Sequence, residues 1–196
     1  MNLRISQNLS IDQPLWRYMS IAKYVSFLAQ SSLWLARADT FSDRQEGRFP
    51  NEMRMTIEKA YLSFSDDDPS PVQDADDFQD YLIKNTFVNC WHKNFDENMV
   101  MWEIYGKRDN GVAIQTTVKN LEKSMDSSKL SGHSLILDNV RYQLADEVQG
   151  VLRYEECFFL KRPHFAFEEE VRLNLDTYSR LHPTKKTDVV TRFLCN

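Results

Sequence analysis

The sequence predicts an α+β fold in a single domain that spans residues 1–196. Hydrophobic residues make up 42% of the chain and aromatic residues 12%, which is enough apolar material for one core of ordinary size. Short apolar segments with strand-like alternation are separated by segments with helical spacing. Only five glycines and six prolines are spread over the chain, and no linker or repeat divides it.

The amino-terminal part predicts a strand, a short helix and a second strand. Residues 14–19 are apolar and aromatic, as in a strand. Ser20 stands where a helix N-cap is expected, and apolar residues follow it at helical spacing. Residues 33–37 are again strand-like.

The middle of the chain alternates polar loops with regular elements. Residues 39–50 are polar and rich in turn formers, and they lead into a helix over 51–61. Residues 65–77 form an acidic stretch that lacks the glycine and late glutamate of a calcium loop, which indicates a solvated loop. A short helix over 78–84 and a strand over 86–91 follow.

The second half predicts further short elements. Apolar residues on one face indicate a helix over 97–105. A turn over 106–111 then leads to a strand over 112–116. A helix over 118–125 and a strand over 134–142 complete this part of the pattern.

The segment over 161–175 is the most informative. Pro163 breaks any helix there. After it, Val171, Leu173 and Leu175 alternate with polar residues, which predicts a half-buried strand with one polar face.

The bulk composition indicates a cytoplasmic protein. The chain has 24 basic and 29 acidic residues, a net charge of −5, which disfavours broad charge-driven binding to nucleic acid. No stretch approaches the roughly 18–20 apolar residues that cross a bilayer, and residues 1–15 do not resemble a signal peptide. Three widely spaced cysteines, Cys90, Cys157 and Cys195, indicate reduced thiols without a disulfide.

Two polar clusters lie near the first strands. Arg17 lies between Trp16 and Tyr18, and strand alternation turns it to the opposite face, so one of the two faces is a cleft or core. An ordinary ion pair at a sheet edge is the alternative. Residues 37–47 form a polar loop directly after a strand, where functional residues gather, although a solvated loop is the alternative.

A third cluster contains Cys90 and His92, which share one face of the predicted strand. This permits a thiol nucleophile, but no nucleophile motif surrounds Cys90, so we expect a buried structural cysteine. Met101, Trp102 and Tyr105 are expected in the core or in a pocket wall.

The fourth cluster is acidic. On an extended strand Glu168, Glu170 and Arg172 fall on one face, with Glu169 on the other. Two carboxylates so close repel each other, and are therefore either neutralised or functional. An ion pair between Arg172 and Glu170 is the purely structural alternative.

Taken in order, these clusters resemble the uncharacterised bacterial family DUF2971, over about residues 15–175. The family commonly shows Asn-Asp-Pro before its loop glutamate, where this chain has Ser42-Asp43-Arg44. The family is in turn similar to a distant branch of the ADP-ribosyltransferase fold. The resemblance rests on Leu15-Trp16-Arg17-Tyr18, residues 36–43 with Glu46, Cys90-Trp91-His92, Met101-Trp102, Tyr105, Gly111, Lys161 and Glu168-Glu169-Glu170-Val171-Arg172.

The resemblance implies an ADP-ribosyltransferase-like split β-sheet core with inserted helices, and NAD as substrate. Glu170 would be the catalytic carboxylate and Glu168 the orienting one, and Arg17 would contact the ribose or phosphates of NAD. We expect the strands over 15–19 and 170–175 to lie close together, with Arg17 and Glu170 facing one cleft. The remaining residues expected to bind the cofactor are Tyr18, Arg37, Asp43, Trp91, Trp102 and Tyr105.

These residue types suit the chemistry. Cleavage of the bond between nicotinamide and ribose builds positive charge on the sugar, which a carboxylate stabilises. Arginine suits a pyrophosphate, and aromatic rings stack on nicotinamide or adenine. The chain has no G-x-G-x-x-G motif, so NAD would not be held in a Rossmann manner.

The leading hypothesis is an NAD-dependent ADP-ribosyltransferase acting on a protein or nucleic acid, as a toxin or phage-defence effector with an antitoxin or defence-system partner. The alternative is a non-catalytic binding or sensing module of a toxin–antitoxin or defence system. A third reading, a metal-dependent hydrolase or nuclease built on Asp43, Glu46, His92 and the glutamates, lacks the tight His/Asp spacing of metal sites, so no metal is expected.

Overall fold

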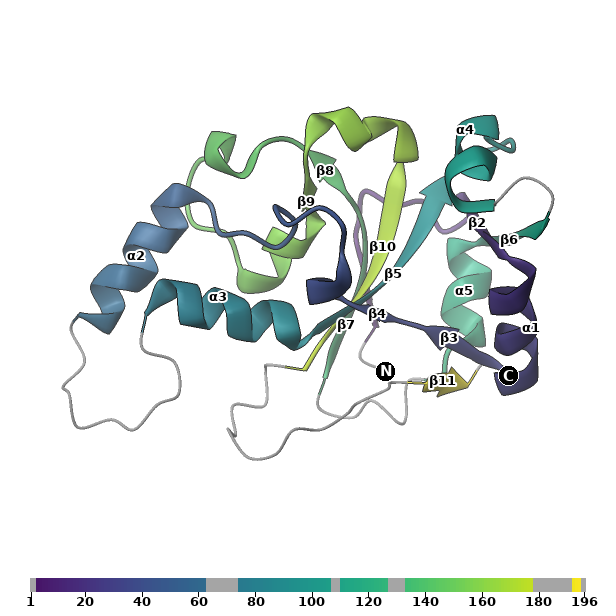
Figure 1. Cartoon of the computed structure of the whole chain (residues 1–196), viewed down its shortest axis with the longest axis horizontal. Helices are drawn as coiled ribbons and strands as arrows, with labels where there is room; N and C mark the ends of the chain where they lie inside the picture. The colour runs from purple at the N-terminus through teal and green to yellow at the C-terminus, as the bar shows by residue number, and fades with distance from the viewer. Residues whose placement is uncertain (1–2, 63–73, 107–109, 127–132, 178–191, 195–196) are drawn as a thin grey trace.

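A mixed β-sheet runs through the middle of the molecule (Figure 1). The computed structural model describes residues 3–62, 74–106, 110–126, 133–177 and 192–194. The strand order is β1-β7-β10-β5-β2-β6, β4 pairs with β5 off this path, and every pair except the parallel β1–β7 is antiparallel. The strands are β1 (Leu3–Ile5), β2 (Pro14–Ser20), β4 (Ala36–Arg37), β5 (Thr86–Lys93), β6 (Gly111–Thr117), β7 (Ser134–Asn139) and β10 (Glu170–Asp176).

Helices cover both faces of this sheet, in agreement with the predicted α+β class. In Figure 1, α2 (Asn51–Tyr61) and α3 (Ala75–Lys84) lie on one side, and α1 (Ile21–Gln30) and α5 (Val118–Ser124) lie on the other. The short α4 (Met99–Met101) continues into a π-helical turn. Two small sheets pair β3 (Ser32–Trp34) with β11 (Arg192–Leu194), and β8 (Arg141–Tyr142) with β9 (Leu160–Lys161).

Capping residues set several element boundaries. The Ser20 hydroxyl accepts a hydrogen bond from the Lys23 amide, which confirms the predicted N-cap of α1. Asp74 caps α3 in the same way, so this helix begins three residues before the predicted start at 78. Residues 75–77 were expected in the acidic loop; they are helical, and the part of that loop over 65–73 lies outside the described residues.

Two other predictions are corrected, and one strand was not predicted. The helix expected over 97–105 begins only after Asn98, whose side chain caps α4, and it changes to a π-helical turn at Trp102. The strand expected over 134–142 is interrupted at Val140, because β7 pairs with β10 while β8 turns away to pair with β9. β1 was not expected at all, since three residues are too few for a periodic signal.

Two hydrophobic clusters pack against the sheet. The first lies between the sheet and α5, and includes Leu15, Trp91, Leu121, Leu137 and Leu173. The second lies on the opposite side, among α2, α3 and a 3-10 segment, Tyr154–Phe159. β10 lies between them and every one of its residues is buried. Its alternation was predicted correctly, but the face expected to meet solvent is buried instead.

The helices of the described part of the chain are all too short or too polar to cross a membrane.

Candidate functional site

A cleft opens where two neighbouring strands part. β2 pairs with β6 along its whole length, from Pro14 to Ser20, but with β5 only at Leu15–Lys93 and Trp16–His92. β4 rejoins β5 at Ala36–Val88. The stretch of β5 between these contacts has no strand partner on this edge among the described residues, and a cavity of about 470 Å³ lies there.

The cavity is lined by polar, charged and aromatic side chains from five segments of the chain. Arg17 and Glu170 are both among the residues that line it. The strands that carry them, β2 and β10, are separated only by β5. Other lining residues are Trp16, Tyr18, Glu46, Cys90, Trp91, His92, Tyr105, Lys161, Glu168 and Arg172.

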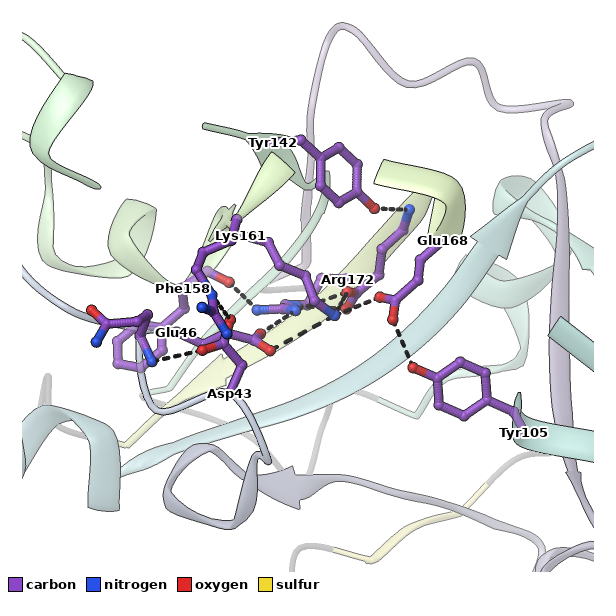
Figure 2. A network of polar contacts seen from close by, with 11 residues as sticks. Asp43, Glu46, Tyr105, Tyr142, Phe158, Lys161, Glu168 and Arg172 are labelled. Carbon is purple, nitrogen blue, oxygen red and sulfur yellow. Dashed lines mark hydrogen bonds and ion pairs between the residues drawn. The ribbon is translucent and has the colours of Figure 1, made fainter. Parts of the chain in front are cut away.

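An ion cluster forms one wall of the cleft (Figure 2). Lys161 Nζ lies 2.5 Å from Glu168 Oε2, 3.2 Å from Glu170 Oε2 and 3.7 Å from Glu46 Oε1. Arg172 donates from Nε to Glu170 Oε1 at 2.7 Å and from Nη2 to Glu46 Oε2 at 2.7 Å. Three carboxylates therefore share two cations, and the cluster carries one excess negative charge when all five groups are ionised.

Burial and neighbouring charge shift the acidic groups in opposite directions. Burial raises the pKa of Glu46, although Arg172 and Lys161 partly offset it. Burial also opposes ionisation of Glu170, but Arg172 and Lys161 outweigh it and lower its pKa to about 2. Burial of Lys161 and Arg172 lowers the pKa of each, but the neighbouring carboxylates outweigh this effect and raise both pKa values. Glu170 is thus ionised and fixed at neutral pH.

Two tyrosines hold the glutamates in place. The Tyr105 hydroxyl donates to Glu168 Oε1 at 2.7 Å, and burial together with this carboxylate raises the Tyr105 pKa. The Tyr142 hydroxyl oxygen accepts a hydrogen bond from the Glu170 amide, also at 2.7 Å. Figure 2 shows both rings directed toward the cluster from different elements.

A backbone turn explains how two glutamates from different elements converge. The sequence led us to expect Glu168 on the same strand as Glu170, and this is wrong: Glu168 ends a 3-10 segment, Pro163–Glu168, and the strand begins at Glu170. Glu169 has a left-handed φ of 39°, an uncommon conformation outside glycine. This turn exposes Glu169 and directs both Glu168 and Glu170 into the cluster.

Arg17 reaches the cleft without a counter-charge. The register aligns Trp16, His92 and Glu170 in one row across the sheet, so alternation directs Arg17 to the other face, where its guanidinium lies 5.9 Å from the Trp91 ring centre. Its Nη1 is buried, and no described residue accepts a hydrogen bond from it. Burial lowers the Arg17 pKa. A ligand anion would relieve this cost.

His92 is a further polar group that the site prediction omitted. It is 1% exposed, and its Nδ1 lies 2.7 Å from the Glu168 carbonyl oxygen, which can only accept, so Nδ1 carries the proton. The other ring nitrogen, Nε2, is buried without a partner among the described residues. This arrangement ties the His92 ring to the backbone at Glu168.

The predicted cofactor-binding residues divide into two groups. Tyr18, Trp91 and Tyr105 line the cleft. Tyr18 also fixes the entry to α4, because its hydroxyl oxygen accepts a hydrogen bond from the Asn98 amide at 2.8 Å. Trp91 is buried against the first hydrophobic cluster. The structure thus brings these three together with Arg17 and Glu170.

The other three do not line the cleft. Arg37 pairs with Asp39 at 2.7 Å on the surface. Asp43 is buried but pairs with Arg162 at 2.9 Å. Trp102 packs edge-on against Tyr18, at a centroid distance of 5.2 Å, and its indole donates to the Glu97 carboxylate. Their expected contact with a cofactor in this cleft therefore has no support in the geometry.

The expectation that Cys90 is buried is wrong. Cys90 is exposed on the cleft, because β2 has already left β5 at this position. Its thiol pKa is nevertheless raised, first by the poorly solvated site and then by the Glu170 carboxylate, which disfavours the thiolate. Cys157 is buried and free, and Cys195 lies outside the described residues.

The metal hypothesis finds no matching geometry. Across the described part of the chain, no group of three or more His, Cys, Asp or Glu residues is arranged to hold a metal ion. Glu46, Glu168 and Glu170 instead face Lys161 and Arg172.

Sequence reasoning also left Glu46, Lys161 and Arg172 outside the predicted site. Lys161 directly follows the apolar residues Phe158–Leu160. A lysine next to a buried apolar segment is usually paired, and this could have indicated that Lys161 belongs to the site.

No family model, curated protein or solved structure matches the chain.

Proposed function

We propose that this protein is an NAD-dependent ADP-ribosyltransferase that transfers ADP-ribose to a macromolecular acceptor, a protein or a nucleic acid. One observation carries the proposal: a single cleft contains Arg17, whose charge has no partner among the described residues, and Glu170, an ionised carboxylate fixed by two cations. The first suits a pyrophosphate, and the second suits a developing positive charge.

The reaction is a substitution at the ribose carbon that bears nicotinamide. The carbon–nitrogen bond breaks, and its electron pair leaves with neutral nicotinamide. An acceptor oxygen or nitrogen then forms the new bond, and the acceptor proton passes to solvent. Positive charge grows on the ribose as the bond breaks, and Glu170 would stabilise it through a ribose hydroxyl.

The surrounding residues take supporting roles in this proposal. Arg17 would bind the cofactor's phosphates, and Tyr18 and Tyr105 would form walls against which a ring can stack. Glu168, held by Tyr105 and Lys161, would orient the substrate beside Glu170. The cleft volume, about 470 Å³, lies within the range of small-molecule sites.

The test is whether purified protein releases nicotinamide from NAD and labels a component of a cell lysate from labelled NAD. Glu170→Gln should reduce specific activity on the order of a hundredfold or more, about 3 kcal/mol of barrier, and more than Glu168→Gln does. Glu169→Gln makes the same chemical change at an exposed neighbouring residue and should leave activity unchanged.

Stability must be separated from catalysis, because Glu170 is bonded to Arg172 and Lys161. Activity is therefore measured per folded molecule, at a temperature well below both melting transitions. Equal specific activity of Glu170→Gln and the parent would refute the catalytic role. Absence of NAD binding and consumption with protein and nucleic-acid acceptors would refute the enzyme proposal.

A non-catalytic binding or sensing module, in a toxin–antitoxin or phage-defence system, is the second candidate. The observation that favours it is that both oxygens of Glu170 already accept hydrogen bonds from protein cations. A folded protein that binds NAD, with an affinity lowered by Arg17→Met, but never consumes it would identify this function.

A further inference from the structure

His92 places one buried polar atom at the cleft that the proposed function does not use. Its side chain lines the cavity and is only 1% exposed. The ring nitrogen Nε2 is buried and has no hydrogen-bond partner among the residues that the structure describes. Buried polar atoms in folded proteins normally have a partner, because leaving one without a hydrogen bond is costly. The free Nε2 therefore indicates a group that binds in the cleft.

The hydrogen bond on the other side of the ring determines what Nε2 can bind. His92 Nδ1 lies 2.7 Å from the Glu168 carbonyl oxygen, which accepts hydrogen bonds but cannot donate them, so Nδ1 carries the proton. In the neutral ring Nε2 then has a free lone pair and can only accept. The missing partner is therefore a hydrogen-bond donor. This excludes the phosphates that we propose for Arg17, because ionised phosphate oxygens only accept.

Protein donors in this part of the cleft are engaged elsewhere. The Trp16 indole, in the same row of the sheet as His92, donates to the Asn94 carbonyl oxygen at 3.0 Å. The Lys161 ammonium and the Arg172 guanidinium bind the carboxylates of the ion cluster. Within the described ranges, the protein thus supplies no donor to Nε2, and a ligand can supply one.

His92 lies directly beside Glu170 in the sheet. The two residues are partners in the antiparallel register of β5 and β10, and their side chains are on the same face. Side chains paired in this way have Cβ atoms about 4.5–5.5 Å apart. A ligand group that is bound at Glu170 therefore lies within reach of His92 as well.

We propose that His92 binds the substrate by accepting a hydrogen bond from a sugar hydroxyl at Nε2. This inference rests on the proposed function, in which Glu170 acts through a ribose hydroxyl. Glu170 would bind the 2′-hydroxyl, because this group is next to the carbon on which positive charge grows. The neighbouring 3′-hydroxyl then donates to His92. The pair selects a ribose with both hydroxyls, and it orients the nicotinamide end of NAD toward the ion cluster.

The test follows the ring nitrogens of His92 in the full chain by proton–nitrogen NMR. These spectra distinguish a protonated ring nitrogen from one with a free lone pair, and the signal of the latter moves upfield when it accepts a hydrogen bond. The probe is a carbocyclic analogue of NAD, whose bond to nicotinamide does not cleave. We expect a protonated Nδ1, a free Nε2 and an upfield shift of Nε2 at saturation. The same analogue without the 3′-hydroxyl of its nicotinamide-bearing ring should bind without this shift.

The outcomes separate this inference from the proposed function. If the analogue shifts the indole signal of Trp91, which lines the cleft, but leaves His92 Nε2 unchanged, the contact is refuted and the proposed function is unaffected. A protonated Nε2 in the free protein would also refute the contact. If the analogue does not bind, both the contact and the proposed function are wrong.

Two substitutions separate the roles of the two ring nitrogens. His92→Asn places an amide nitrogen near Nδ1, which keeps a donor for the Glu168 carbonyl oxygen, but it removes the acceptor at Nε2. It should weaken binding of the analogue about five- to tenfold, as expected for one hydrogen bond, and retain Tm. His92→Gln places an amide oxygen near Nε2 but loses the donor to Glu168, and it should bind the analogue more tightly than His92→Asn. The reverse order of affinities would show that only the bond to Glu168 matters.

The matched control is His164→Asn, the same change at an exposed histidine that does not line the cleft, and it should leave affinity unchanged. The loss of affinity in His92→Asn should disappear for the analogue without the 3′-hydroxyl, because this ligand has no donor to lose. An equal loss for both analogues would contradict the contact. If the His92 variants do not fold, the titration of the parent protein decides alone.

Discussion

Replacing Glu170 with glutamine should destabilise the protein by an amount that depends on pH. In the folded state the pKa of Glu170 is lowered from 4.5 to about 2, chiefly because Arg172 and Lys161 outweigh the effect of burial. A difference of about 2.5 pH units corresponds to about 3 kcal/mol of folding free energy at neutral pH. Glu170→Gln also relieves the repulsion that helps to raise the pKa of Glu46, so the measured loss should not exceed this value.

The sign follows from the direction of the shift. A carboxylate with a lowered folded-state pKa stabilises the native state above its ordinary pKa, and this stabilisation is lost as pH falls from about 4.5 toward 2. Near pH 3 less than about half of the neutral-pH contribution remains. Glutamine does not titrate, so the difference in the free energy of unfolding between the parent and Glu170→Gln should become smaller as pH falls over this range.

The assay is urea unfolding of both proteins at several pH values between 7 and 3. The matched control, Glu169→Gln, changes an exposed neighbour and should alter the free energy of unfolding by less than about 0.5 kcal/mol at every pH. If the difference in the free energy of unfolding between the parent and Glu170→Gln stays constant from pH 7 to pH 3, the assignment of Glu170 as the ionised centre of the cluster is refuted.

Three further predictions concern neighbouring residues. Arg17→Met should weaken NAD binding about tenfold or more in calorimetry, yet keep or raise Tm, because the parent buries a charge without a partner; unchanged affinity would contradict the proposed contact. Cys90→Ser should retain specific activity within a few-fold, since the raised thiol pKa disfavours a nucleophile; complete loss in a folded variant would show the opposite. Glu46 has a raised pKa, so its contribution to stability is present below about pH 4.5 and is lost as pH rises. In urea unfolding, the free energy of unfolding of Glu46→Gln should therefore increase relative to that of the parent as pH rises. A decrease relative to the parent would contradict this.

Local sequence signals were sufficient where one element determines its own boundaries. The Ser20 cap and the apolar spacing after it define α1, and the alternation after Pro163 defines β10. In both cases the boundaries of the element are determined by residues only a few positions apart in the sequence. The resemblance led us to expect that Arg17 and Glu170 face one cleft; both residues line the cavity, but the strand register directs their side chains to opposite faces of the sheet.

The ion cluster could not be derived in this way, because its contacts join distant positions. Arg172 bonds Glu46 across 126 positions, and Arg162 bonds Asp43 across 119. A polar face on β10 predicts exposure when the strand is considered alone. It becomes a buried charged wall because β9 brings Lys161, and the 3-10 segment Pro163–Glu168 brings Glu168, to the same place.

Arg17 lines the cleft but takes no part in its ion cluster, and the sheet register explains why. Strand alternation directs Arg17 to the face opposite to Trp16 and Glu170, where its guanidinium lies over the Trp91 ring. Burial lowers the Arg17 pKa, and an ion pair would remove that cost. A ligand with phosphates at one end and a sugar that gains positive charge at the other would satisfy both walls at once. This separation of charge is the reason that we propose NAD and not a ligand of a single charge.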